Sequence, residues 1–194
     1  MEMYQEFMGD IAKEIDRENK IITDLLSLVK MDRSGQTMNI QSVNINELLE
    51  QILKRLKPIA EKQSVEMVLE TFRPVNAEID ETKFTLAVSN LVENAIKYNR
   101  ENGWVHVSLN ADHKYFYVKV EDSGIGIPEE DQEHIFERFY RVDKSHSREI
   151  GGTGLGLAIA RNAVIVHRGS IRVYSNKGEG TTFTVRIPLT YVTG

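Results

Sequence analysis

The stretch NLVENAIKYN, residues 90–99, predicts a helix with an apolar face that can pack in a core and a polar face that can bind a ligand. At about 100° per residue, one arc of this helix holds Asn90, Asn94, Lys97 and Tyr98. The other arcs hold apolar residues, namely Phe84, Val88, Leu91, Val92, Ala95 and Ile96. An amide oxygen is a hard, neutral ligand for Mg²⁺, and an ammonium group pairs with phosphate. We therefore expect a metal ion at Asn94 and a phosphate at Lys97; the alternative is the solvated side of an ordinary amphipathic helix.

Downstream, EDSGIGIP at residues 121–128 follows a predicted strand that ends at Val120. The carboxylate of Asp122 can accept a hydrogen bond from the exocyclic amine of adenine, whereas guanine presents an oxygen acceptor at that position. Gly124 and Gly126 allow a flat base to approach the backbone closely. These residues predict a preference for adenine nucleotides; the simpler alternative is a D-x-G turn after a strand.

A glycine-rich run, GGTGLGLAIA at residues 151–160, leads directly into a predicted helix that ends near His167. Free backbone N–H groups and the positive end of the helix dipole make such a start a site for anions. A Rossmann site is excluded because the preceding SHSREI is not a strand, and a Walker A site because no Gly-Lys-Ser/Thr follows. The run therefore predicts a phosphate site of another kind.

The charged segment 128–149 lies between the two glycine motifs and is longer than an ordinary connection, which is typical of a lid. Its centre, HIFERFYRVD, predicts a short helix with Ile135, Phe136, Phe139 and Val142 on one side. From this lid Arg141 can reach a γ-phosphate, whereas Arg138 is expected in solvent. For Phe136 and Phe139 a functional lid and a local hydrophobic clasp both remain open.

Outward from these motifs, helix and strand patterns alternate. An uninterrupted amphipathic pattern predicts one long helix over residues 4–31, whose apolar seam is Met8, Ile11, Ile15, Ile22, Leu25 and Val29. The polar segment 32–39 predicts a domain boundary. Two further helices are expected, one over 46–63 capped by Asn46 and containing Pro58, and one over 80–99 capped by Asp80. The expected strands span residues 65–72, 104–109, 115–120, 170–175 and 181–188.

Composition narrows the class of protein. The 194 residues carry a net charge of −5 with both signs mixed along the chain, so no basic stripe suggests binding to nucleic acid or anionic lipid. The chain has no cysteine, which excludes disulfides, thiolate nucleophiles and cysteine-ligated zinc and favours the cytoplasm. No apolar run reaches the roughly 18 residues that cross a bilayer, so we expect no membrane segment in this chain.

The motifs, in this order, resemble those of the sensor histidine kinases of the GHKL ATPase superfamily. NLVENAIKYN resembles the N box, DSGIGIP the G1 box, FERFYR the F box and GGTGLGL the G2 box, and the ending GEGTTFTVRIPL is also characteristic. The resemblance runs from about Ile40 to the C-terminus, and it is specific because the short motifs keep their order. It implies an α/β fold of the Bergerat type, a two-layer sandwich of a mixed sheet backed by helices, preceded by one long N-terminal helix.

The same resemblance implies domain limits and individual roles. Residues 1–33 resemble the second helix of the dimerisation and phosphotransfer domain, and residues 38–194 resemble the ATP-binding catalytic domain. The implied cofactors are ATP and Mg²⁺, with Asn94 as the metal ligand and with Asn90, Lys97 and Arg141 as catalytic residues. The implied nucleotide contacts are Asn90, Asn94, Lys97, Tyr98, Asp122, Gly124, Gly126, Ile127, Arg141, Gly152, Thr153, Gly154, Leu155 and Gly156.

Asn90 separates two activities within the superfamily. The ATP-hydrolysing relatives place a glutamate at this position to activate water, and an amide cannot accept that proton. Phosphoryl transfer to a histidine is therefore favoured, while an ATP-hydrolysing clamp and a non-catalytic nucleotide-binding or dimerisation module are the alternatives. Glu93, one residue from Asn94, is expected to be solvated.

The acceptor histidine of such kinases lies in an H-E-x-x-P-like box on the first of two antiparallel helices, and this chain resembles only the second. Its five histidines, His106, His113, His134, His146 and His167, have no such context. We therefore expect the acceptor on the phosphoacceptor helix of a longer parent kinase, one that is dimeric and anchored in the cell membrane. The expected downstream partner is the receiver domain of a response regulator.

Overall fold

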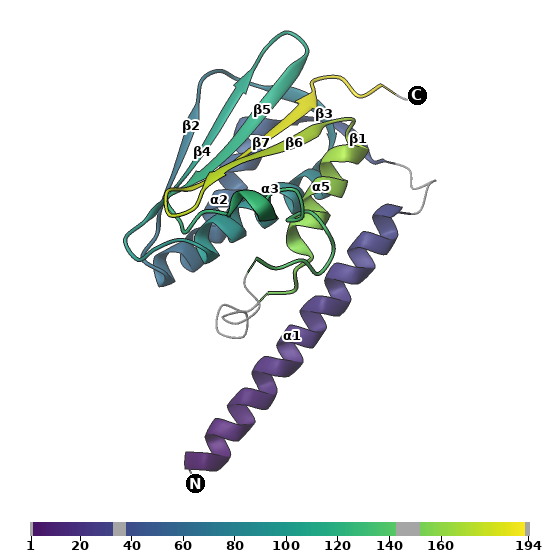
Figure 1. Ribbon diagram of the computed structural model, residues 1–194. Helices are drawn as coiled ribbons and strands as arrows, with labels where there is room; N and C mark the ends of the chain where they lie inside the picture. The colour runs from purple at the N-terminus through teal and green to yellow at the C-terminus, as the bar shows by residue number, and fades with distance from the viewer. Residues whose placement is uncertain (1, 33–37, 143–151, 193–194) are drawn as a thin grey trace.

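Helix α1 (Glu2–Asp32) is continuous, as predicted, and extends well beyond the rest of the chain (Figure 1). The computed structural model describes residues 2–32, 38–142 and 152–192. Most of the predicted seam is exposed, including Met8, Ile15 and Ile22. The C-terminal half of α1 instead packs on the α/β unit through the fully buried Leu28, with Leu25 and Met31 partly buried beside it.

A mixed five-stranded sheet forms one layer of the α/β unit, in the order β2-β4-β5-β7-β6. Its strands are β2 (Glu66–Thr71), β4 (Trp104–Ala111), β5 (Tyr115–Asp122), β6 (Ser170–Asn176) and β7 (Gly180–Pro188). Only the β2–β4 pair is parallel; the other pairs of this sheet are antiparallel. A small antiparallel sheet joins β1 (Ile40–Asn44) to β3 (Asn76–Asp80).

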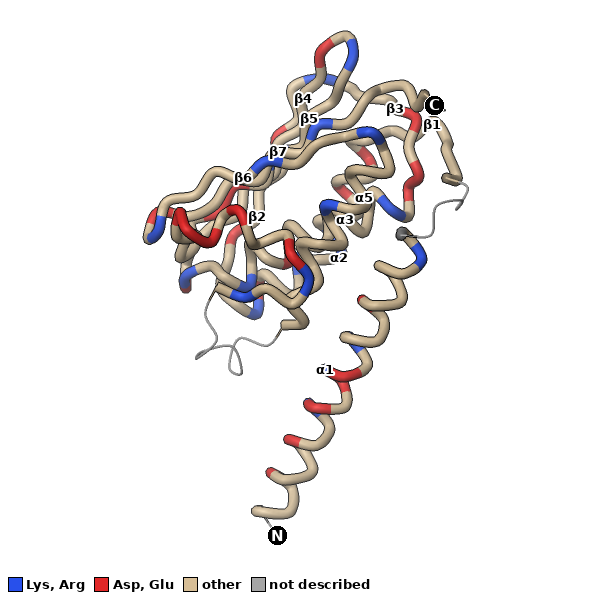
Figure 2. Tube along the Cα trace, turned by 45° about the vertical axis from the view of Figure 1, so that its right-hand side comes forward, with Lys and Arg blue, Asp and Glu red and all other residues tan. Residues whose placement is uncertain are grey.

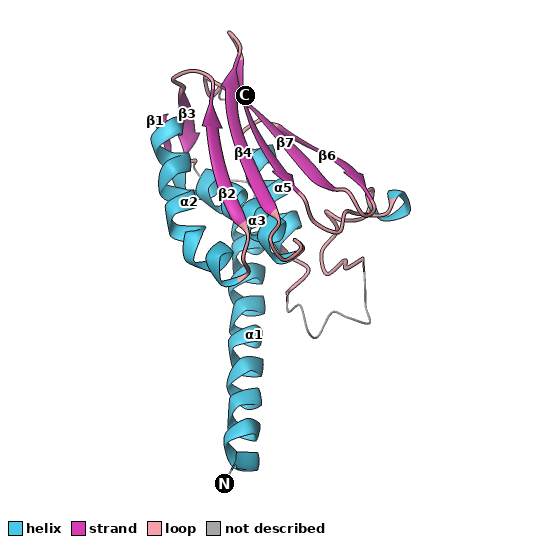
Figure 3. Cartoon of the chain, turned by 90° about the vertical axis from the view of Figure 1, so that its left-hand side faces the viewer, coloured by secondary structure: helices cyan, strands magenta, loops and turns pink. Residues whose placement is uncertain are grey.

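Three helices cover one face of the larger sheet and form the second layer (Figure 3). They are α2 (Ile45–Lys62), α3 (Glu81–Lys97) and α5 (Gly156–Val166), and a short 3-10 helix, η1 (Glu129–Asp131), follows β5. The core lies between the layers because alternate strand residues such as Val107, Val118 and Val185 point at the helices and are fully buried. Phe84 of α3 meets Phe116 of β5 edge to face, with ring centroids 5.7 Å apart. The predicted two-layer fold is confirmed.

Charges of both signs are interspersed along the described chain, in keeping with the composition (Figure 2).

The N-terminus of α3 is tied to the C-terminus of α5. Asp80 caps α3 as predicted, since its Oδ1 accepts from Lys83 N at 3.1 Å. The backbone N–H of Asp80 donates to Nε2 of the buried His167 at 3.0 Å, and Nδ1 of His167 lies 2.6 Å from the Ala163 carbonyl oxygen. The ring is therefore neutral with its proton on Nδ1, and burial lowers the pKa of His167.

The predicted N-cap of α2 is wrong. The cap of α2 is Asn44 and not Asn46, because the Asn44 side chain accepts from Glu47 N at 3.2 Å. The Asn46 side chain bonds across the chain instead, to Arg73 O at 3.1 Å and Val75 N at 2.8 Å. Strand β3 was also not predicted.

The predicted short helix in HIFERFYRVD is absent; the chain forms successive turns there. Phe139 has φ of 63° and is 57% exposed, so it cannot share one buried side with its neighbours. Ile135 is buried and Phe136 packs edge to face on Phe183 of β7 at 6.1 Å, whereas Val142 is exposed. The remainder of the predicted lid, with His146 and Gly151, lies outside the described residues.

Candidate nucleotide-binding site

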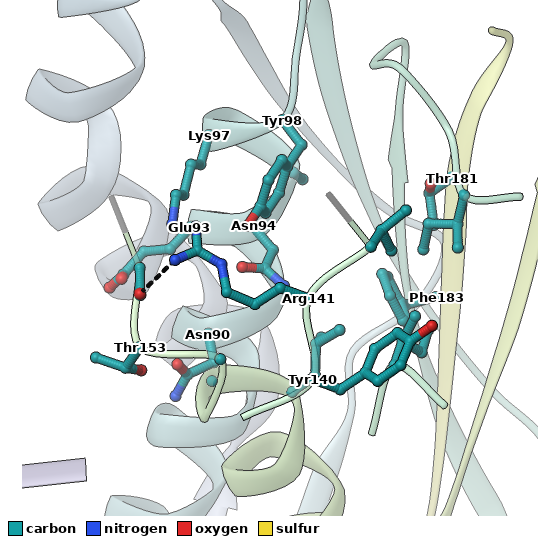
Figure 4. Close-up of a pocket in the computed structure, with 18 of the residues that line it drawn as sticks. Asn90, Glu93, Asn94, Lys97, Tyr98, Tyr140, Arg141, Thr153, Thr181 and Phe183 are labelled. Carbon is teal, nitrogen blue, oxygen red and sulfur yellow. Dashed lines mark hydrogen bonds between the residues drawn. The ribbon is translucent and has the colours of Figure 1, made fainter. Parts of the chain in front are cut away.

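A cleft of about 400 Å³ opens beside the C-terminal half of α3, between the loop after β5 and the loop before α5 (Figure 4). The structure brings nearly all of the predicted contacts together in its lining: Asn90, Asn94, Lys97, Tyr98, Asp122, Gly126, Ile127, Arg141, Gly152, Thr153, Gly154 and Gly156. Gly124 and Leu155 lie outside the lining. Clefts of this size bind small molecules, so the shape suits a nucleotide.

Helix α3 presents its polar residues to the cleft in the predicted phase. Asn90 donates from Nδ2 to the Leu86 carbonyl oxygen at 2.9 Å, which fixes the amide and leaves its Oδ1 facing the start of α5. A Cβ built on Gly156 would lie only 2.8 Å from that Oδ1, so the two helices meet closely here. On an adjoining face of α3, Leu91 is fully buried.

Cations gather at one end of the cleft. Arg141 donates from Nη1 to the Gly152 carbonyl oxygen at 3.1 Å, and a Cβ built on Gly152 would lie 2.1 Å from Lys97 Nζ (Figure 4). Burial, with the positive charges of Arg141 and Lys20, lowers the pKa of Lys97 to about 8. Neighbouring cations repel each other and so disfavour each other's charged form. A bound anion relieves this repulsion, so this end of the cleft is suited to phosphate.

Asp122 occupies the other end. Its Oδ1 accepts from Gly124 N at 2.8 Å and from Thr181 N at 3.3 Å, and burial raises the pKa of the carboxyl to about 6. Gly124 is needed for backbone packing, because a Cβ there would lie 2.3 Å from the Tyr98 carbonyl oxygen. Both of these hydrogen bonds hold Oδ1, and Asp122 belongs to the lining of the cleft.

Apolar side chains between the two ends were missed by sequence reasoning. They are Ile125, Ile135, Leu157 and Phe183, with Tyr140 and Thr181 beside them. The signal that could have found Thr181 is the strand register, since β5 and β7 pair Asp122 with Thr181. Such a wall suits the faces of an aromatic base.

Helix α1 also contributes to the cleft. Lys20 and Asp24 belong to its lining, and the Thr153 hydroxyl donates to Asp24 Oδ2 at 2.7 Å. Lys20 Nζ lies 3.8 Å from Glu93 Oε2. The Glu93 side chain is 40% exposed, so it is partly solvated at the edge of the cleft. The contact with α1 was not predicted.

Oxygen donors on α3 fit a divalent cation that arrives with phosphate. Asn90 and Asn94 offer amide oxygens and Glu93 a carboxylate on the same stretch of helix. Among the described residues, no group of three or more His, Cys, Asp or Glu side chains forms a metal site on its own. Mg²⁺ commonly takes one or two protein oxygens and completes its shell with phosphate and water, so this donor set fits it.

Comparison with known proteins identifies the family. Residues 79–191, more than half of the chain, match the family described as histidine kinase-, DNA gyrase B-, and HSP90-like ATPase. The chain belongs to this family. It is 40% identical over 185 residues to the sensor histidine kinase WalK of Bacillus subtilis, an alignment that covers 94% of this chain and 30% of WalK.

Solved structures of histidine kinases share the fold. The catalytic domain of histidine kinase ThkA matches with a TM-score of 0.69 and 29% identity, covering 80% of this chain and all of that domain. ThkA in complex with response regulator protein TrrA matches with a TM-score of 0.76 and 27% identity, over 95% of this chain and 51% of that chain. This chain therefore carries the histidine kinase type of ATP-binding domain found in two-component systems.

The chain spans about a third of the length of the WalK proteins that it matches. None of the described helices is long and apolar enough to cross a membrane.

Proposed function

We propose that this chain is the catalytic part of a sensor histidine kinase, which binds Mg-ATP and passes the γ-phosphate to a histidine on another segment. The observation that carries the proposal is one cleft that has a half-buried carboxylate, Asp122, at one end and the cations Lys97 and Arg141 at the other. Adenine needs an acceptor for its amine, and the triphosphate needs positive charge. The cleft offers both in one cavity.

At the adenine end, Gly124 N and Thr181 N hold Asp122 Oδ1, which leaves the second oxygen to accept from the exocyclic amine. Apolar side chains of the cleft lining, Ile127 and Phe183 among them, would shield the faces of the base from water. Exclusion of water makes the loss of this one hydrogen bond costly, so the carboxylate selects adenine over guanine.

At the phosphate end, Lys97 and Arg141 orient the γ-phosphate, and the glycines of the loop before α5 let its backbone approach the oxygens. Asn94, with Asn90 beside it, would hold the Mg²⁺. When bound, that ion neutralises charge on the β- and γ-phosphates. The side chains of this chain thus bind, orient and shield the reacting phosphate.

Transfer is favoured over hydrolysis because of Asn90. Its Nδ2 is engaged with Leu86 O, and its amide cannot take a proton from water. Glu93 is a carboxylate on the same helix, but it is not at the position of the hydrolytic glutamate, and it lies at the edge of the cleft beside Lys20. Measured ATP turnover to free phosphate should therefore be slow.

The phosphate-accepting histidine is proposed to be none of the histidines that the structure describes, because each of these has another contact or lies away from the cleft. His106 is 3.1 Å from Glu70 on the open face of the sheet, His134 pairs with Glu137 at 2.7 Å, and His167 is buried. His113 lies in the turn between β4 and β5. We infer that residues 1–33 belong to a dimerisation and phosphotransfer domain, that residues 38–194 form the catalytic domain, and that a response regulator receives the phosphate from the parent dimer.

The test measures nucleotide binding and transfer separately. Calorimetry with ATP, with and without Mg²⁺, should show Mg²⁺-dependent binding that Asn94→Ala weakens. Incubation with γ-labelled ATP should leave the 194-residue chain unlabelled, and adding a helical hairpin that carries a histidine acceptor and pairs with α1 should give an acid-labile label on the hairpin. Acid-labile label on a histidine of the chain itself would contradict the proposed division of labour.

A further inference from the structure

The C-terminal half of α1 rests on the phosphate end of the cleft. Leu28, 1% exposed, packs against Leu155, Ala158 and Ile159 at the start of α5. Leu155 directly follows the glycine-rich loop, so the apolar contact brings α1 against the same loop that is proposed to hold phosphate. The position of α1 and the conformation of that loop are therefore linked.

A polar contact lies beside this apolar one. Thr153 of the loop donates its hydroxyl hydrogen to Asp24 Oδ2 at 2.7 Å, while its oxygen accepts from Leu155 N at 3.2 Å. A hydroxyl has one hydrogen, so Thr153 cannot donate to a phosphate oxygen while it donates to Asp24. Thr153 neighbours Gly152, whose carbonyl oxygen is bound by Arg141, so Asp24 brings a negative charge to the cationic end.

We propose that Asp24 makes the cleft distinguish nucleoside triphosphates from diphosphates, because docked α1 and a γ-phosphate compete for Thr153 and for the same cationic surroundings. This inference rests on the proposed function. Phosphate oxygens only accept hydrogen bonds, as does the Asp24 carboxylate, and the two negative groups repel at close range. A diphosphate lacks the terminal group and leaves the Asp24–Thr153 bond in place.

Competition of this kind acts in both directions. If docked α1 weakens triphosphate binding, then triphosphate binding must weaken α1 docking by the same factor. Lys20 adds a second contact on the same face of α1 through Glu93, so the docked helix is held at two points around the cleft. Occupation by a triphosphate would thus release the helix, whereas occupation by a diphosphate would retain it.

The decisive experiment compares affinities for AMP-PNP and ADP in Mg²⁺ by calorimetry on the full chain. Asp24→Asn keeps an acceptor for Thr153 but removes the charge, and it should tighten AMP-PNP about 10-fold while ADP changes little. The matched control is Asp16→Asn, an exposed carboxylate two turns earlier on α1, which should change neither affinity. Equal tightening of both nucleotides, an unchanged ratio, or weaker AMP-PNP binding in Asp24→Asn would overturn the inference.

A distance measurement tests the reciprocal effect. The chain has no cysteine, so Glu14→Cys on α1 and Tyr174→Cys on β6 can be spin-labelled without background. AMP-PNP should broaden or shift the distance between the labels, and ADP should not; identical distances with both nucleotides would refute the coupling. Failure of the wild-type chain to bind either nucleotide would instead refute the proposed function, so the two failures are distinguishable.

Discussion

Asp122→Asn is the substitution that tests the adenine assignment most directly. The structure uses one carboxylate oxygen, Oδ1, to accept from Gly124 N and Thr181 N. An asparagine carbonyl oxygen can take over both bonds, which places its NH₂ group where the second carboxylate oxygen stood. The loop is thereby preserved, while an acceptor in the cleft becomes a donor.

The expected loss follows from that exchange. A buried donor of adenine that loses its acceptor costs about 1 to 3 kcal/mol, which corresponds to roughly a 5- to 150-fold weaker binding of ATP. Guanine presents an oxygen acceptor at the same position, so binding of GTP should improve in the variant. The ratio of ATP to GTP affinity should therefore fall by more than the ATP affinity alone.

The pH dependence of ATP affinity gives an independent check on the role of Asp122. The pKa of Asp122 is raised to about 6 by burial, so below that pH the free carboxyl holds a proton and no longer offers a free acceptor. Wild-type affinity for ATP, divided by that of Asp122→Asn at each pH, should decline as the pH falls from 7.5 to 5. Phosphate ionisation affects both proteins equally and cancels in the ratio.

The assay is calorimetry with ATP and GTP, with the midpoint of thermal unfolding as a check on the fold. Asp112→Asn is the matched control, because Asp112 Oδ1 also accepts two backbone N–H groups, from Lys114 at 2.7 Å and Tyr115 at 2.8 Å, but in an exposed turn. ATP affinity that is the same in Asp122→Asn as in wild type, at an unchanged unfolding midpoint, would refute the adenine assignment.

Three further predictions concern the helices around the cleft. Leu91→Ala should lower the free energy of unfolding by about 2 to 5 kcal/mol because Leu91 is fully buried. Asn94→Ala should instead keep the unfolding midpoint and lose the Mg²⁺-dependent part of ATP affinity. If denaturant titrations gave the opposite pattern, the assignment of the buried and cleft-facing sides of α3 would be wrong. Burial and nearby cations lower the pKa of Lys97 to about 8, so about half of the Lys97 side chains are unprotonated at pH 8. A bound triphosphate should raise that pKa, so binding at pH 8 should take up about half a proton. Calorimetry in two buffers of different ionisation enthalpy measures the uptake, and Lys97→Met should abolish it. Burial lowers the pKa of His167 and favours its neutral form in the folded state. Its contribution to stability is therefore present above the ordinary pKa of 6.5 and is lost as the pH falls below that value toward the lowered pKa of the folded state. The denaturant midpoints at pH 7.5 and 5.5 should differ less in His167→Gln than in wild type.

The sequence predicts the parts of the site that local chemistry determines. The phase of α3 follows from apolar spacing, so Asn90, Asn94 and Lys97 face the cleft as expected. Asp80 caps α3 because a short acceptor side chain precedes an apolar helix. Most of the strands and helices also lie within a few residues of their predicted limits.

The remainder depends on packing between distant segments. Phe183 and Thr181 line the cleft only because β7 pairs with β5 in one register, which apolar alternation alone does not determine. Asn44 and Asn46 are both good caps, and the choice depends on the bond between Asn46 and Val75. The left-handed φ of Phe139 and the contact of α1 with Thr153 likewise have no local signal.

The hydrogen bond between Asp80 and His167 fixes the end of α5 that is farther from the cleft. It joins the C-terminal end of α5 to the N-terminal end of α3, both remote from the cleft, while Gly156 and Asn90 meet beside it. Helix α5 has 11 residues and so acts as a lever about 16 Å long with its fulcrum at His167. A displacement of roughly 1 Å at Gly156 then needs a tilt of only about 3 to 4°, given the rise of a helix per residue. Rotations of this size about the His167 end would change the separation between the glycine-rich loop and α3 while leaving the His167–Asp80 bond in place.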